Sequence, residues 1–229
     1  MERSPDESSW MIFGLMDIAA PRIGSLLIPG VIWQLPAAAG SACALTFDDG
    51  PTPGVTDRIL DLLEEARMPA TFFVLATEAS RHPRIIEQMI ANGHDIGLHG
   101  LDHRDPWKSS QSALIASLDQ ARDVLTDLTG QSLIAYRPAY GHLTPRLLRW
   151  AKESGLPLVM WDFLAGDFRR NASPASIAGR VHGYAKPGSI IVLHDNEAAG
   201  HIAADSLPGI EAVLQQLILR PITLSQALS

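Results

Sequence analysis

The sequence of 229 residues contains a single cysteine, Cys43, which lies inside an apolar run. One cysteine cannot form a disulfide within the chain, so a fold stapled by disulfides is excluded. Positive charge is also scarce, because 18 Lys and Arg stand against 25 Asp and Glu and give a net charge of -7. Nucleic-acid-binding domains usually gather basic residues on one face, so we expect no nucleic-acid partner.

A long uninterrupted apolar segment is missing as well. Residues 11–35 are apolar on average, but Asp17, Pro21, Arg22 and Pro29 interrupt them. A membrane-spanning helix needs roughly 20 predominantly apolar residues, so we expect no transmembrane segment. The stretch that precedes it, MERSPDESS, is acidic rather than basic, unlike the start of a secretory signal.

The lack of a recognisable signal favours a cytoplasmic location, and the length of 229 residues favours one domain, with two small domains as the alternative. We expect the apolar N-terminal stretch to form a helix or two that pack on this domain. Peripheral association of the stretch with a membrane is the alternative, although the basic face typical of interfacial helices is missing. Apolar residues make up 46% of the chain and charged residues 19%, which is ordinary for a domain with a buried core.

From Cys43 onwards, apolar runs alternate with amphipathic stretches. The patterns predict strands over 42–47, 70–75, 94–99, 133–137, 157–161, 188–194 and 221–224. They predict helices over 55–68 and 82–93, from Ser109 or Ser110 to Gly130, and from about Pro208 to Leu219. Thr144 and Ser173, each followed by proline, are predicted N-caps.

Continuous apolar strands separated by helices indicate an α/β protein whose parallel sheet is covered on both faces. About seven such units fit either a closed or nearly closed barrel or an open doubly wound sheet. The glycine-rich turn of dinucleotide-binding folds is absent, which removes the main sign of a Rossmann fold.

Polar residues follow the ends of successive predicted strands. They are Asp48 and Asp49, His99 and His103, Arg137 and Tyr140, Asp162 and Asp167, and His194 and Asp195. Barrels of parallel strands place their chemistry at the carboxyl ends of the strands. The shared position therefore predicts one functional site.

His99 and His103 are four residues apart, a spacing that on a helical turn places two imidazoles on one face. Together with one carboxylate they would form a metal site that keeps open positions for water and substrate. The chain contains eight histidines, so two unrelated histidines at this spacing are the alternative.

Asp48 and Asp49 stand side by side in the stretch TFDDGP. Neighbouring side chains of a strand point to opposite faces, so both can face one site only where the strand ends, at Gly50-Pro51. One aspartate could then bind a metal while the other lies beside the metal-bound water, because a divalent cation offsets the repulsion between two carboxylates. The alternative is an aspartate pair that bonds the local backbone of a turn.

Five stretches resemble, in order, the five motifs of the polysaccharide deacetylases, also called the NodB-homology domain or carbohydrate esterase family 4. They are TFDDGP (46–51), HGLDH (99–103), RPAYG (137–141), WDFLAGDF (161–168) and IIVLHD (190–195). The resemblance runs from Ala42 to the C-terminus, so we assign residues 1–40 to an N-terminal extension and 41–229 to the deacetylase domain. It implies a distorted (β/α) barrel with the N-terminal extension packed on it.

The resemblance also implies a role for each matching residue. Asp49, His99 and His103 would bind one divalent metal ion, most often zinc, with cobalt, nickel or manganese as alternatives. Asp48 would be the general base, held by Arg137, and His194 would be the general acid, tuned by Asp167. The residues expected to contact substrate are Tyr140, through its backbone N–H, and Leu193, Phe168 and Trp161.

The implied activity is metal-dependent hydrolysis of acetyl groups on N-acetylated amino sugars in poly- or oligosaccharides. Removal of O-acetyl groups from a glycan is one alternative, and a weakly active or inactive sugar-binding protein of the same fold is another. The sequence departs from the usual motifs in ways that affect loop rigidity and pocket shape, at Gly100, Arg104, Ala139, Leu164 and Phe168.

Overall fold

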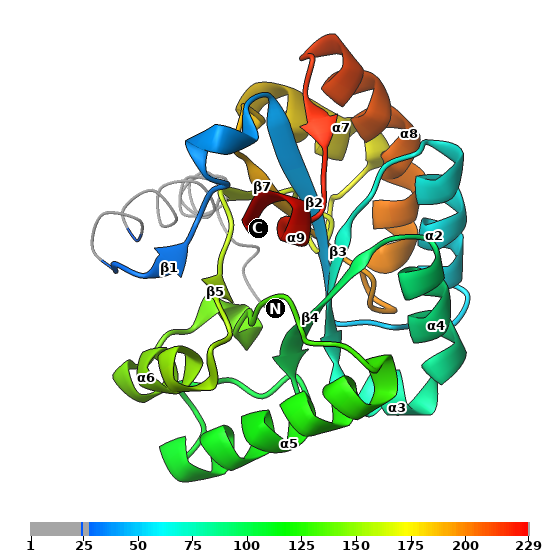
Figure 1. Ribbon diagram of the computed structural model, residues 1–229. Helices are drawn as coiled ribbons and strands as arrows, with labels where there is room; N and C mark the ends of the chain where they lie inside the picture. Colours follow the sequence, from blue (N-terminus) through cyan, green and yellow to red (C-terminus); the bar gives the residue numbers. More distant parts are fainter. Residues whose placement is uncertain (1–23, 25–27, 229) are drawn as a thin grey trace, which may run out of the picture.

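The computed structural model describes residue 24 and residues 28–228 (Figure 1). The helices expected within residues 11–35 therefore fall mostly outside the described residues. In the part that is described, Val31–Ile32 forms a short strand, β1, rather than a helix. The boundary assigned after residue 40 stays a prediction. None of the helices in the described part of the chain is long and apolar enough to cross a membrane.

A parallel sheet occupies the centre of the domain, with strand order β4-β3-β2-β7-β6 and β8 paired beside β2. Its strands are Ala42–Asp48 (β2), Thr71–Leu75 (β3), Asp95–Gly100 (β4), Phe163–Leu164 (β6), Ile190–His194 (β7) and Arg220–Pro221 (β8). The long strands are buried almost throughout, as continuous apolar runs predict for strands covered on both faces.

The ring of strands continues around the molecule through much weaker pairing. Strand β1 pairs in parallel with β5, Leu158–Val159. Tyr136 forms single bridges to β4 and to β5, and Gln34 forms a single bridge to Ser189 just before β7. The predicted α/β fold with mostly parallel strands is confirmed, and the barrel is distorted because no continuous ladder of the described residues closes this side.

Helices surround the strands on the outside, except for the short last helix, which lies over one end of the ring (Figure 1). They are Thr56–Glu65 (α2), Ala76–Arg81 (α3), Pro83–Ala91 (α4), Gln111–Thr129 (α5), Pro145–Ser154 (α6), Pro174–Tyr184 (α7), Gly200–Gln216 (α8) and Leu224–Leu228 (α9). The predicted N-caps are confirmed, since the side chains of Ser110, Thr144 and Ser173 each accept a hydrogen bond from a backbone N–H of the first helical turn. Gly130 ends α5 in the left-handed conformation that favours glycine.

Two further sequence predictions of secondary structure are wrong. The last long helix begins at Gly200, not at Pro208, which lies inside α8. Proline lacks the N–H that bonds to the preceding turn, but Leu207 and Ile210 are buried there, and their burial keeps the helix continuous. Residues 133–137 form no strand, and only Tyr136 within them makes bridges.

Two separate apolar clusters hold the domain together. The larger one lies between the strands and the surrounding helices. The smaller one includes Ala44, Phe73, Val159 and Ile190 from strands around the ring, and Ala135 from the segment before Tyr136. Helix α9 caps the amino ends of two strands, because the Thr71 hydroxyl accepts from the backbone of α9 and the Asp95 carboxylate accepts from Ser225. The opposite end, where the strands finish, is left open.

Candidate active site

The two adjacent aspartates lie at the carboxyl end of the central strand. Asp48 is the last residue of β2, and Asp49 has a φ of 85°. Positive φ is uncommon outside glycine, and aspartate is among the residues that tolerate it. This conformation breaks the alternation of the strand, and both carboxylates line the same cavity.

Asp195 secures the turn that follows the aspartate pair. Its carboxylate accepts hydrogen bonds from the Gly50 N–H and from the Thr56 hydroxyl, both at 2.8 Å. A Cβ atom on Gly50 would lie 1.9 Å from Asp195 Oδ2, so only glycine fits at this position. Burial raises the pKa of the Asp195 carboxyl to about 7. Asp195 therefore holds the loop and does not line the cavity.

Three potential metal ligands converge beside this turn. Oδ1 of Asp49 lies 3.2 Å from Nε2 of His99 and 3.1 Å from Nε2 of His103. One ligand atom of each residue lies within 4.8 Å of those of the other two. Oδ1 of Asp49 is buried and has no hydrogen-bond partner among the described residues. A divalent cation fits this donor set, because carboxylate oxygen and imidazole nitrogen are ordinary ligands of zinc and similar metals.

The two histidines do not share a helical turn, as their spacing suggested. His99 belongs to β4, and His103 lies in the loop after it. The chain bends between them at Gly100, whose φ of 134° favours glycine. Nδ1 of His99 lies 2.9 Å from the carbonyl oxygen of Arg137. A proton on Nδ1 is donated to this carbonyl, which leaves the lone pair of Nε2 directed at Asp49.

The electrostatics favour the ionisation states that a metal needs. Burial opposes ionisation of the Asp49 carboxyl, but the contact with His99 and the charges of His99, His194 and His103 hold its pKa well below the usual range. Burial lowers the pKa of His103. An anionic carboxylate and a neutral imidazole are the forms that bind metal. Nδ2 of Asn196 donates to Oδ2 of Asp49 at 2.7 Å and orients the carboxylate.

Asp48 is held by a fully buried arginine. Nη1 of Arg137 donates to Oδ1 of Asp48 and to the Thr46 hydroxyl, both at 2.7 Å. Its other nitrogens donate to the carbonyl oxygens of Val159 and Met160. A buried charge is tolerated when it is paired and hydrogen-bonded, and Arg137 meets both conditions. The aspartate pair is thus divided between two environments, since Asp49 faces the histidines and Asp48 faces Arg137.

A histidine and an aspartate form a second pair beside the first, because His194 ends β7 and is the register partner of Asp48 in β2. Oδ2 of Asp167 accepts from the backbone N–H of His194 at 2.6 Å, and its Oδ1 lies 3.0 Å from Nδ1 of the imidazole. Burial opposes the charged imidazolium, but the Asp167 carboxylate outweighs it and raises the pKa of His194 to about 9. With Nδ1 bound to Asp167, Nε2 is the nitrogen able to donate a proton.

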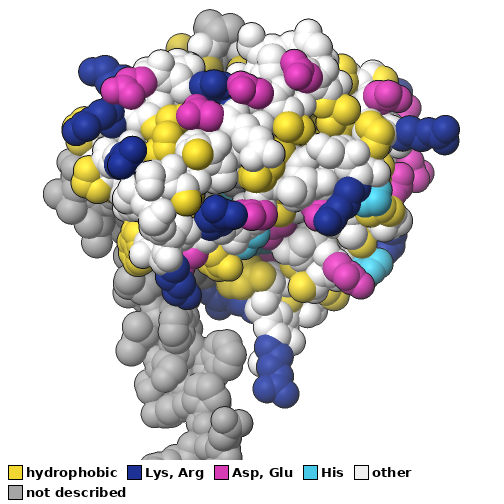
Figure 2. Space-filling model, turned by 90° about the horizontal axis from the view of Figure 1, so that it is seen from below, with side chains coloured by type: hydrophobic (Ala, Val, Ile, Leu, Met, Phe, Trp, Pro, Cys, Tyr) yellow, Lys and Arg dark blue, Asp and Glu magenta, His cyan; other side chains and the backbone are white. Residues whose placement is uncertain are grey.

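These groups surround one cavity of about 300 Å³ at the open end of the strands. Figure 2 views this end and shows acidic and histidine side chains meeting near its centre. The residues lining the cavity are Asp48, Asp49, His99, His103, Pro138, Tyr140, Gly141, Trp161, Leu164, Phe168, His194 and Asn196.

The cavity brings together most of the site residues expected from the sequence. Leu193 is not among its described lining residues, because it is fully buried in β7. Asp162 lies elsewhere, where it accepts hydrogen bonds from Gln34 and Ser189 and ties the segment after β1 to β7. Asn196 also lines the cavity and was not predicted from the sequence, although it directly follows the motif that ends in Asp195.

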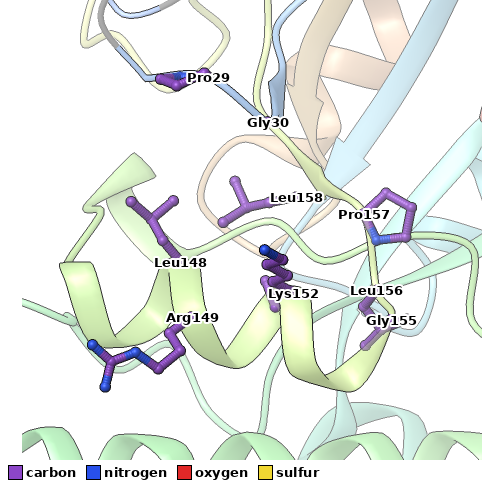
Figure 3. A pocket seen from close by; sticks show the side chains of 10 residues that line it. Pro29, Gly30, Leu148, Arg149, Lys152, Gly155, Leu156, Pro157 and Leu158 are labelled. Atoms are coloured by element: carbon purple, nitrogen blue, oxygen red, sulfur yellow. The ribbon is translucent and has the colours of Figure 1, made fainter.

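A larger hollow of about 850 Å³ lies between α6, β5 and the turn at Pro29 and Gly30 (Figure 3). Its charged lining residues in the described part of the chain are Arg149 and Lys152. No carboxylate or histidine of the described residues lines it, so it offers neither an acid–base pair nor a metal site. We therefore assign the chemistry to the smaller cavity.

Comparison with known proteins agrees with this geometry. Residues 37–159, more than half of the chain, match the family model described as polysaccharide deacetylase. A peptidoglycan-N-acetylglucosamine deacetylase of Bacillus cereus is 33% identical over 189 residues, 82% of this chain and 86% of the relative. A chitooligosaccharide deacetylase of Rhizobium leguminosarum bv. trifolii is 32% identical over 166 residues, 72% of this chain and 77% of the relative.

Other relatives are longer than the part they share with this chain. The matched region spans 62% of a second Bacillus cereus deacetylase and 33% of one from Listeria monocytogenes. Among solved structures, the Bc1960 peptidoglycan N-acetylglucosamine deacetylase superposes with a TM-score of 0.83 at 29% identity and covers 89% of this chain and 95% of that one. The chain belongs to the polysaccharide deacetylase family.

Proposed function

We propose that this protein hydrolyses the acetyl amide of N-acetylated amino sugars in oligo- or polysaccharides, with one divalent metal ion held by Asp49, His99 and His103. Zinc is the first candidate for this metal. The relatives named as deacetylases of peptidoglycan and of chitooligosaccharides support the reaction class. The observation that carries the proposal is the division of the aspartate pair, one carboxylate beside two histidines and the other bound to Arg137.

A metal bound at this site would lower the pKa of a coordinated water and polarise the acetyl carbonyl. Asp48 supplies the general base. Arg137 occupies its Oδ1, so Oδ2 accepts the proton from the attacking water. The positive charge of Arg137 also offsets the cost of burying the Asp48 carboxylate, which is only 4% exposed.

His194 supplies the proton for the leaving group. An amine leaves poorly as an anion, so cleavage of the amide needs protonation of the nitrogen. Asp167 fixes Nδ1 of His194 and raises its pKa to about 9, so the imidazolium persists at neutral pH with Nε2 available to the cavity. Asp48 and His194 end the neighbouring strands β2 and β7 as register partners, and they act as base and acid on the same scissile bond.

The experiment that tests the function is acetate release. Metal-loaded protein is incubated with N-acetylglucosamine oligomers, with peptidoglycan fragments and with an acetyl ester, and acetate is measured over time. We expect release from at least one glycan, and loss of release after treatment with a chelator. Asp48→Asn is expected to reduce the rate by roughly 10²–10⁴-fold, the usual range for a general base.

Asp61→Asn is the matched control, because Asp61 is an exposed aspartate on α2. It should leave the rate unchanged. Wild-type protein with bound metal that releases acetate from neither glycan would overturn the proposal. Release from the ester alone would point to O-deacetylation instead.

A further inference from the structure

Exposed aromatic side chains gather beside the cavity. Four large aromatics of the described residues are exposed: Trp107 at 65%, Tyr140 at 57%, Phe168 at 49% and Tyr184 at 39%. Tyr140 and Phe168 line the cavity itself. Trp107 does not line it, yet it is more exposed than either. Large apolar groups left open to solvent in one place often mark a binding surface.

A continuous row of rings links Trp107 to the metal ligands. The ring centroids of His103 and Tyr140 are 4.4 Å apart, and those of Tyr140 and His142 are 5.7 Å apart. The indole of Trp107 stacks on His142 with a centroid distance of 3.6 Å and an interplanar angle of 4°. The row therefore runs outward from the cavity and ends on Trp107, whose second face is the one left to solvent.

Hydrogen bonds fix the outer end of this row. Oδ1 of Asp105 lies 2.7 Å from Nδ1 of His142 and also accepts from the backbone N–H of Trp107 at 2.9 Å. Nε1 of Trp107 donates to the carbonyl oxygen of Leu143 at 3.0 Å. One carboxylate thus holds both stacked residues, and the indole has its only polar atom occupied. Trp107 is prepared as a rigid, flat and apolar surface.

The chemistry of such a surface suits a sugar ring. The faces of a pyranose carry C–H groups, which are apolar and slightly positive, whereas an aromatic face is negative. A rigid aromatic side chain binds with little loss of conformational entropy. A sugar lying on Trp107 would sit at a distance from the reacting acetyl group, since Tyr140 and His142 intervene.

We propose that Trp107, supported by His142 and Asp105, binds a neighbouring sugar unit of the substrate, so that the protein acts on glycan chains in preference to single amino sugars. This proposal rests on the proposed deacetylase function. It assigns Trp107 to substrate binding and makes Asp105 a positioning residue that acts through His142.

The test compares substrates of different length. Acetate release is measured with N-acetylglucosamine and with its hexamer, for the wild type, Trp107→Ala and Trp107→Phe. We expect Trp107→Ala to raise KM for the hexamer by roughly 2- to 10-fold, the range expected for loss of an aromatic contact. Rates with the monosaccharide should not change, and Trp107→Phe should retain most of the hexamer affinity.

Tyr184→Ala is the matched control, because Tyr184 is exposed on α7 and lies outside the row. It should leave KM unchanged for both substrates. An unchanged hexamer KM in Trp107→Ala would overturn the proposal. A merely structural role would lower kcat for both substrates together and lower the melting temperature, which would overturn it as well.

Binding of the hexamer to the metal-loaded protein, measured by calorimetry, separates this proposal from the proposed function. If the wild type binds the hexamer more tightly than Trp107→Ala does but releases no acetate, the role of Trp107 in sugar binding stands and the proposed deacetylase function is refuted. If the wild type releases acetate but both proteins bind the hexamer equally well, the deacetylase function stands and the role of Trp107 is refuted.

Discussion

The two halves of the strand ring are built differently. Strands β2, β3 and β4 contain five to seven residues each and pair along most of their length. From Tyr136 to Phe168 the chain contributes single bridges and two-residue strands to the ring. The three proposed metal ligands follow the regular half, whereas the irregular half supplies residues of the cavity wall, including Trp161, Leu164 and Phe168.

The difference reflects what each half has to hold. Metal ligands must keep their donor atoms within a few tenths of an ångström, and a continuous hydrogen-bonded ladder provides that rigidity. The wall that meets a substrate needs only shape and a few polar contacts, so short strands suffice there. Three of the departures from the family motifs, Ala139, Leu164 and Phe168, lie in the irregular half.

The largest effect is expected from the regular half. His103→Ala removes one proposed ligand and should weaken metal binding by more than about 100-fold, since loss of a residue that merely supports a ligand already costs 10–100-fold. Metal content after dialysis measures this. His201→Ala changes an exposed histidine on α8 and should leave metal content unchanged. Full metal occupancy in His103→Ala would contradict the assignment.

Arg137 joins the two halves, and its removal should be the largest destabilisation. Arg137→Leu leaves the buried Asp48 carboxylate without its partner, which should lower the free energy of unfolding by about 3–5 kcal/mol. Denaturant unfolding measures the change. Arg149→Leu, an exposed arginine on α6, should fall within about 0.5 kcal/mol of wild type. Equal stability of the two variants would show that the ion pair contributes little.

The His194–Asp167 pair should set the alkaline limit of activity. The pKa of His194 is raised to about 9, so the proton donor is lost as pH rises through that value. Asp167→Asn removes the charge that raises this pKa. If the pKa returns to about 6.5, the protonated fraction at pH 8 falls roughly 30-fold. The profile of kcat/KM against pH measures this shift, and an alkaline limb that stays near pH 9 would contradict it.

The same pair links stability to pH. Because the folded pKa of His194 lies above its unfolded value, its stabilisation is fully present below about pH 6.5 and is lost as pH rises through about 9. The free energies of unfolding of the wild type and of Asp167→Asn should therefore differ most at the low-pH end of this window, near pH 6.5. A stability difference between the two proteins that grows from pH 6.5 to 9 would contradict this prediction.

The smallest effect is expected at a helix cap in the irregular half. Thr144 caps α6 through the backbone N–H of Leu147. Thr144→Ala should cost about 1 kcal/mol of unfolding free energy and leave metal content unchanged. Thr144→Ser keeps the hydroxyl and is the control, so its free energy of unfolding should stay close to that of the wild type. An equal loss of unfolding free energy in both variants would exclude the cap as the cause.

Much of the regular half could be predicted from the sequence. Strands β2, β3 and β7 are largely apolar runs, which is the pattern that buried parallel strands require, whereas glycines weaken this pattern in β4. The caps at Ser110, Thr144 and Ser173 depend on local hydrogen bonds, so neighbouring residues suffice to predict them. Asp49, His99 and His103 could be grouped because each follows a predicted strand.

The irregular half could not be predicted in the same way. Strands of two residues, such as β1 and β6, show no periodicity. Contacts between distant parts of the chain could not be predicted either, since the Thr46 hydroxyl accepts from Arg137 91 residues away and Asn196 donates to Asp49 147 residues away. Trp107 stood in a loop without a pattern, and only the fold brings it onto His142.

The central claim is that the two adjacent aspartates have different tasks, and one paired measurement tests it most directly. Metal content and acetate release are determined on the same preparations of Asp48→Asn and Asp49→Asn. We predict that Asp48→Asn retains about one metal ion per chain but loses release, whereas Asp49→Asn loses both. Asp49→Asn with full metal content, or Asp48→Asn with normal release, would contradict the account.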